Sequence, residues 1–163
     1  MESWKFWGMD DTDLTNATPE VALILAAGLG SRLRPQTKTP KPLTRVLGLT
    51  LAERVVCILL DVGVRRFLVT LGHEAETVRA HISNIARRRG VTIDFIEAED
   101  WEQGNGASAL AAKGRTGEAP FFLVMIDHHF DPEIARALAD DPPAPGEMCL
   151  AVDRDKDAIF DLD

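Results

Sequence analysis

Val21-Ala-Leu-Ile-Leu-Ala-Ala27 is an unbroken apolar run, and Gly28-Leu-Gly30-Ser31-Arg32 follows it directly. A short apolar run that ends at glycine is typical of a strand buried on both faces, as in a parallel sheet. The two glycines mark the loop that leaves this strand. We therefore expect a central strand with a glycine-rich loop at its carboxyl end.

Apolar runs and helical patterns alternate on both sides of this strand. Further strands are predicted over residues 66–71, 91–96, 120–126 and 147–152, and helices over residues 50–61, 74–89, 105–113 and 132–139. This alternation predicts a three-layer α/β fold, a doubly wound, Rossmann-like and mainly parallel sheet. Ligands of such folds bind beyond the carboxyl ends of the strands, so the chemistry is expected in the loops that follow them.

Composition excludes several protein classes. The chain has 163 residues, 45% hydrophobic and 27% charged, which predicts one globular domain. It has no apolar run long enough for a transmembrane helix, and its acidic start does not have the layout of a signal peptide. Cys57 and Cys149 lie in apolar runs and are expected to be buried free thiols. A cytoplasmic setting is the resulting expectation.

Charge is distributed unevenly along the chain. The net charge is −8, which argues against nucleic-acid binding. Residues 21–90 nevertheless carry 12 basic and four acidic side chains, whereas residues 91–163 carry five basic and 17 acidic ones. A basic first half suits a small polyanion such as a nucleotide. The alternative is that these charges lie on solvated helix faces.

Two common phosphate-binding motifs do not fit the glycine loop. A dinucleotide fingerprint requires glycine where Leu33 stands, and a P-loop requires lysine directly after Gly30. The loop still offers glycine backbone that can approach a phosphate, and Arg32 has a fork that matches phosphate oxygens. Lys41 lies between two prolines that stiffen the chain. From spacing alone, a glycine turn with surface cations is an equally good interpretation.

The combination of an apolar strand, Gly28-Leu-Gly30-Ser-Arg32 and then Lys41-Pro-Leu43 is more selective. It resembles the signature of the nucleotidyltransferases that couple nucleoside triphosphates to phosphorylated sugars or alcohols, a superfamily with GT-A-type and MobA-like NTP transferase domains. Two later segments agree with this resemblance, Trp101-Glu-Gln-Gly-Asn-Gly-Ala-Ser108 and Phe121-Phe-Leu-Val-Met-Ile-Asp127. Together with the following histidine, they are most similar to the inositol-1-phosphate cytidylyltransferase branch.

The resemblance implies specific roles. Arg32, Lys41 and Asp127 would be catalytic, and Asp127 would bind the catalytic Mg²⁺, which also explains an aspartate at the end of a buried strand. The expected nucleotide-binding residues are Ala26, Ala27, Gly28, Gly30, Ser31, Arg32, Lys41, Gly104, Asn105, Gly106 and Ser108. A zinc site at His128-His129 is disfavoured, because neighbouring side chains on a strand point to opposite faces. His73 lies in the region expected to face the base.

The implied reaction transfers a nucleoside monophosphate from an NTP, with CTP favoured, to a phosphorylated polyol or sugar, with inositol-1-phosphate favoured. Alternatives are a sugar-1-phosphate or molybdenum-cofactor nucleotidyltransferase, and a nucleotide-binding module without turnover.

Residues 1–20 are expected to be an extension whose Trp4, Phe6 and Trp7 could instead form an interaction patch. Residues 21–163 would be the nucleotide-binding part of a domain that in the family continues into an acceptor-binding part. The acids near the end match no family motif, namely Asp153, Asp155, Asp157, Asp161 and Asp163.

Overall fold

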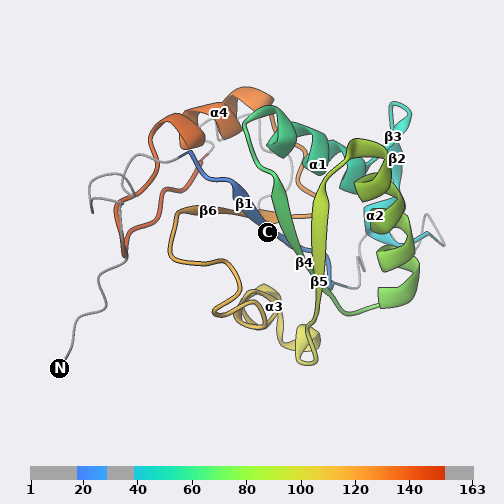
Figure 1. The fold of residues 1–163 in the computed structure, drawn as a ribbon. Coiled ribbons are helices and arrows are strands. Elements are labelled where there is room, and N and C mark those ends of the chain that lie inside the picture. Colours follow the sequence, from blue (N-terminus) through green and yellow to red (C-terminus); the bar gives the residue numbers. More distant parts are fainter. Residues whose placement is uncertain (1–17, 29–38, 153–163) are drawn as a thin grey trace.

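A four-stranded sheet organises the protein, which is described by a computed structural model over residues 18–28 and 39–152. Its strand order is β5-β4-β1-β6, with every neighbouring pair parallel (Figure 1). The strands are β1 (Val21–Leu25), β4 (Arg66–Leu71), β5 (Thr92–Glu97) and β6 (Phe121–Met125). The helices are α1 (Leu51–Asp61), α2 (Ala75–Arg89), α3 (Asn105–Leu110) and α4 (Pro132–Asp140).

Short elements fill the connections. Two 3₁₀ turns, η1 (Lys41–Leu43) and η2 (Trp101–Gln103), precede α1 and α3. Between η1 and α1 lies a small antiparallel hairpin, β2 (Arg45–Val46) with β3 (Leu49–Thr50), which the sequence analysis did not predict. Its two turn residues, Leu47 and Gly48, have φ of 49° and 87°. Positive φ at both positions matches the right-handed twist that a two-residue hairpin requires.

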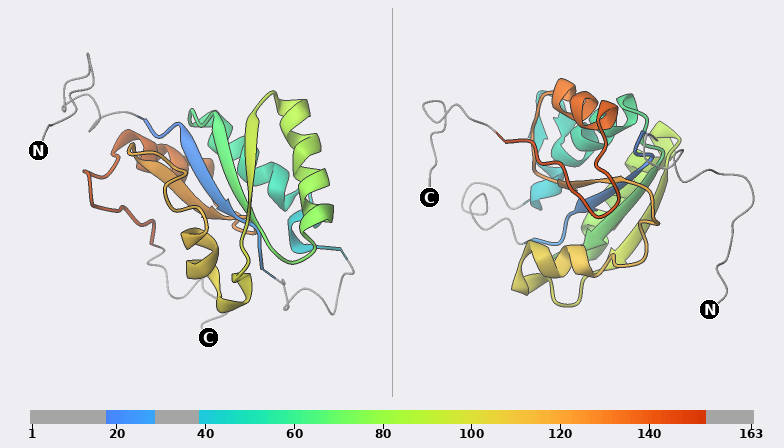
Figure 2. Two further views of the ribbon diagram at one scale, coloured as in Figure 1. Left: turned by 60° about the horizontal axis from the view of Figure 1, so that its bottom comes forward. Right: turned by 90° about the vertical axis from the view of Figure 1, so that its left-hand side faces the viewer.

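The helices are distributed unequally over the two faces of the sheet. Helices α1, α2 and α4 pack on one face, and of the described helices α3 alone covers the other (Figures 1 and 2). The larger core lies under the three helices and includes Ile24, Phe67 and Leu59, all fully buried. The smaller core, around Leu23 and Leu68, lies on the side of α3. The predicted three-layer α/β class is confirmed, with one thick and one thin helical layer.

One predicted strand is wrong. Within residues 39–152, the segment 147–152 forms no strand, although Met148-Cys-Leu-Ala-Val152 is a continuous apolar run. Met148, Leu150 and Val152 are 86%, 76% and 65% exposed. An apolar segment is stable as a strand only where a neighbouring strand pairs with it and its apolar side chains are covered. Both thiols are free, as expected, but the expected burial is wrong: Cys149, in this segment, is exposed, and Cys57 on α1 is only half-buried.

The order of the strands creates a switch point. From β1 the chain crosses to β4 on one side, and it later returns to place β6 on the other side of β1. In sheets of this class, ligands usually bind at the carboxyl ends of the strands beside such a point, here β1 and β6. No helix among the described residues is long and apolar enough to cross a bilayer.

Candidate active site

The structure brings Lys41 and Asp127 together across 86 residues of sequence. The Lys41 Nζ donates a hydrogen bond to the Asp127 Oδ2 and forms an ion pair with it. Asp127 lies two residues beyond β6, where the His128 N–H donates to the Met125 carbonyl and turns the chain. Lys41 is the first residue of η1. Two residues predicted to be catalytic thus meet at the carboxyl edge of the sheet, beside the switch point.

Asp127 also has a spare ligand atom. Its Oδ1 is buried and has no hydrogen-bond partner among the described residues. A buried carboxylate oxygen without a partner is costly unless a cation or donor satisfies it. Mg²⁺ is commonly held by one or two carboxylates, with substrate phosphates and waters completing its shell. The free oxygen of Asp127 therefore fits a magnesium ligand that works together with a bound triphosphate.

Backbone hydrogen bonds to β4, and to the residues that follow it, hold the carboxyl end of β1 in place. The Ala26 N–H donates to the Thr70 carbonyl at 3.0 Å, and the His73 N–H donates to the Ala27 carbonyl at 3.0 Å. Ala26 and Ala27 are buried, whereas Gly28 is exposed. A Cβ on Gly28 would meet nothing within 4 Å among the described residues. No described residue therefore fills the space beside the Gly28 backbone.

Gly72 and Trp101 form a close contact that no sequence motif predicts. A Cβ on Gly72 would lie 2.5 Å from the Trp101 Cγ and 2.8 Å from the Ala27 carbonyl oxygen. The indole of Trp101 thus packs on the Gly72 backbone, and its ring centre is 5.8 Å from that of His73. Only glycine leaves room for this contact. The sequence gives one hint of this contact, which is that a glycine, Gly72, directly follows a predicted strand.

The segment that contains Gly104 starts α3. Gly104 has φ of 104°, a conformation that favours glycine, and it is followed by Asn105, whose amide Nδ2 lies 3.5 Å from the Met125 Sδ. Gly106 has open space around it among the described residues. Ser108 is buried, and its hydroxyl donates back to the Gly104 carbonyl at 3.4 Å. Gly104, Asn105 and Gly106 therefore lie at the exposed start of α3, and Ser108 faces the protein.

Other predicted residues are placed as follows. Gly30, Ser31 and Arg32 lie outside the described residues. His128 and His129 are exposed. Within residues 18–28 and 39–152, no three His, Cys, Asp or Glu side chains are grouped closely enough to hold a metal by themselves.

Comparison with known proteins identifies the family. Residues 22–159 match the family described as the MobA-like NTP transferase domain. A bifunctional IPC transferase and DIPP synthase of Rubrobacter xylanophilus is 39% identical over 146 residues, which are 89% of this chain and 31% of that protein. A 2-aminoethylphosphonate cytidylyltransferase of Lancefieldella rimae is 34% identical over 130 residues, which are 76% of this chain and 51% of that protein.

A solved structure agrees with these relatives. The inositol-1-phosphate CTP transferase from T. maritima matches with a TM-score of 0.69 and 25% sequence identity, over 78% of this chain and 51% of that one. The chain thus spans about half, or less, of the length of the relatives it matches. From its motifs, its sheet topology and these similarities, the chain belongs to the MobA-like NTP transferase domain family of nucleotidyltransferases.

Proposed function

We propose that this domain transfers a nucleoside monophosphate from an NTP, with CTP favoured, to a phosphorylated polyol or sugar and releases pyrophosphate. The observation that carries the proposal is the meeting of Lys41 and Asp127 at the switch point, with one Asp127 oxygen unpartnered among the described residues. A lysine and a carboxylate at one point can address two parts of a triphosphate, its oxygens and its metal ion.

In this reaction an oxygen of the acceptor phosphate attacks the α-phosphorus in line. The new P–O bond forms as the bond from the α-phosphorus to the bridging oxygen breaks, and the electron pair leaves with pyrophosphate. The acceptor oxygen is already anionic, so no general base is required. Lys41 would bind oxygens of the reacting phosphates and stabilise the charge that develops there, and Arg32 would bind the triphosphate. Magnesium held by Asp127 would neutralise phosphate charge.

Names of the relatives support the favoured substrates. The similar T. maritima protein is an inositol-1-phosphate CTP transferase, and the Lancefieldella rimae relative is a 2-aminoethylphosphonate cytidylyltransferase. We therefore favour CTP and inositol-1-phosphate. Residues 21–163 would form the nucleotide-binding part of the domain. A nucleotide-binding module without turnover is the second candidate, and measurements of NTP binding and of pyrophosphate release distinguish the two.

A thermal-shift panel of the four NTPs with Mg²⁺, followed by pyrophosphate release with inositol-1-phosphate and sugar phosphates, tests the proposal. A ligand at 100 times its dissociation constant stabilises the folded state by about 2.7 kcal/mol, which is readily detected. We expect CTP with Mg²⁺ to raise the melting temperature most, and Asp127→Asn to lose the magnesium-dependent part of that rise. Binding without pyrophosphate from any acceptor would favour the module, and no NTP binding would exclude both candidates.

A further inference from the structure

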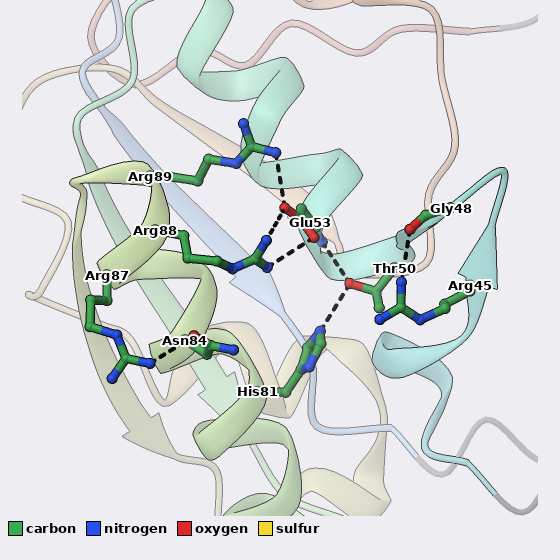
Figure 3. A network of polar contacts seen from close by, with 9 residues as sticks. All are labelled: Arg45, Gly48, Thr50, Glu53, His81, Asn84, Arg87, Arg88 and Arg89. Atoms are coloured by element: carbon green, nitrogen blue, oxygen red, sulfur yellow. Dashed lines mark hydrogen bonds and ion pairs between the residues drawn. The ribbon is translucent and has the colours of Figure 1, made fainter.

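A buried carboxylate joins α1 to α2 outside the active site (Figure 3). Glu53 is 4% exposed. Arg88 donates to both of its oxygens, at 3.0 and 3.1 Å, and Arg89 donates to its Oε1 at 2.9 Å. The hydrogen bond from Arg88 is the main cause that lowers the pKa of Glu53 below its ordinary value, so the carboxylate is ionised at neutral pH. The start of α1 is thereby held to the end of α2.

A second contact joins the same helices and includes the β2–β3 hairpin. Thr50 ends β3 and caps α1, where its Oγ1 accepts a hydrogen bond from the Glu53 N–H at 3.2 Å. The same Oγ1 lies 3.0 Å from the Nε2 of His81 on α2. Figure 3 shows His81 directed from α2 toward this hydroxyl. One buried threonine side chain therefore connects β3, α1 and α2.

The backbone leads directly from this contact to Lys41. The Leu51 N–H, one residue after Thr50, donates to the Thr44 carbonyl at 3.0 Å. The Thr44 N–H in turn donates to the Lys41 carbonyl at 3.1 Å. Pro42 is buried, and η1 packs against both α1 and α2. These two hydrogen bonds thus tie the segment from Lys41 to Leu51 together, and the one made by Leu51 lies directly beside Thr50.

We propose that His81 is a positioning residue for Lys41, which acts through its contact with the Thr50 hydroxyl to keep the 41–51 segment seated between α1 and α2. Lysine has a long flexible side chain, so the backbone position of Lys41 decides where its Nζ can reach. Displacement of about 1 Å at such a group lowers turnover strongly. The catalytic consequence rests on the proposed function, whereas the placement of Lys41 against Asp127 does not.

The chain provides matched control variants. Arg87 donates to Asn84 on the same helix at 2.8 Å, so Arg87→Ala removes a hydrogen bond of α2 that does not join it to α1. Ile85 is buried on α2, and Ile85→Val weakens the packing of that helix without touching the contact between His81 and Thr50. His81→Gln retains a polar group at a similar reach, whereas His81→Leu loses it.

Acylation of Lys41 by a water-soluble N-hydroxysuccinimide ester, followed by peptide mass spectrometry, measures its placement without substrate. Lys113 is exposed and serves as the internal reference. We expect His81→Leu to raise the Lys41/Lys113 rate ratio about fivefold, the factor that corresponds to one lost hydrogen bond. The ratio should stay near the wild-type value in His81→Gln, Arg87→Ala and Ile85→Val.

Three results would overturn the proposal: an unchanged ratio in His81→Leu, an equal rise in Ile85→Val, or His81→Gln that labels like His81→Leu. If His81→Leu does not fold, Thr50→Val against Thr50→Ser poses the same question from the partner side. In pyrophosphate release, His81→Leu should lower kcat about fivefold at unchanged KM for NTP, and should have no further effect in a Lys41→Ala background. If the wild-type chain releases no pyrophosphate, the proposed function fails, and the labelling ratio still decides the role of His81.

Discussion

At the scale of single residues, Lys41 is the group on which the proposed chemistry depends most. It is a half-buried cation at the switch point, and electrostatic stabilisers of this kind contribute about 3–4 kcal/mol to turnover. We expect Lys41→Ala to lower pyrophosphate release by about a hundredfold or more. Lys113→Ala, which removes an exposed lysine beyond α3, should leave the rate unchanged. A near-normal rate in Lys41→Ala would remove Lys41 from the catalytic residues.

Gly72 provides a prediction on stability at the same scale. In Gly72→Ala the new methyl group would meet the Trp101 ring at 2.5 Å and the Ala27 carbonyl oxygen at 2.8 Å. Because backbone cannot move as freely as a side chain, we expect a loss of about 1–3 kcal/mol in the free energy of unfolding in urea. Gly106→Ala is the matched control: it has open space among the described residues and should stabilise α3 by about 0.5–1 kcal/mol. Equal effects at both positions would contradict this account of the Trp101 contact.

At the scale of elements, the Glu53 contact between α1 and α2 predicts a pH dependence. Arg88 and Arg89 hold the pKa of Glu53 below its ordinary value of 4.5 in the folded protein. Its contribution to stability is therefore complete above pH 4.5 and is lost as the pH falls through the lowered pKa. Glu53→Gln should destabilise the protein by about 2 kcal/mol at pH 7, because hydrogen bonds to a charged group are lost.

Melting temperatures of the wild-type and Glu53→Gln proteins between pH 7 and pH 3 check this prediction. The difference between them should shrink only below pH 4.5. Glu133→Gln is the control, because Glu133 forms an exposed ion pair with Arg136 along α4. Such surface pairs contribute about 0–1 kcal/mol. A constant difference across the whole range would show that the ionisation of Glu53 is not what holds the two helices.

At the scale of the whole molecule, the unequal helical layers leave apolar surface on the side of α3. Leu123 on β6 is 57% exposed, whereas Leu23, its neighbour in register on β1, is 3% exposed. We expect Leu123→Thr to change the free energy of unfolding by about 0.5 kcal/mol or less and to reduce light scattering at high concentration. Leu23→Thr at the paired position should cost about 2–4 kcal/mol. A similar loss at both positions would mean that Leu123 is covered in solution.

Most elements were predictable because their signals are local. The run that ends at Ala27, the helix that ends at Gly90 and the Pro132 start of α4 each contain their own pattern and boundary. The β2–β3 hairpin was not predicted because each of its strands has only two residues. Its turn residue Leu47 also has a positive φ, which a leucine in the sequence does not indicate. The prediction of a strand over residues 147–152 was wrong because an apolar run does not show whether a partner strand is present.

The sequence by itself determined the family and the parallel α/β fold, because glycine, arginine, lysine and aspartate at fixed distances from apolar strands form a recognisable pattern. Only the tertiary structure decided that Lys41 meets Asp127, that Trp101 packs on Gly72, and that Glu53 binds two arginines of α2. These contacts join residues that lie 86, 29 and about 35 positions apart. The physical reason is that strand order brings such groups together, and spacing along the chain does not encode which ends of which strands become neighbours.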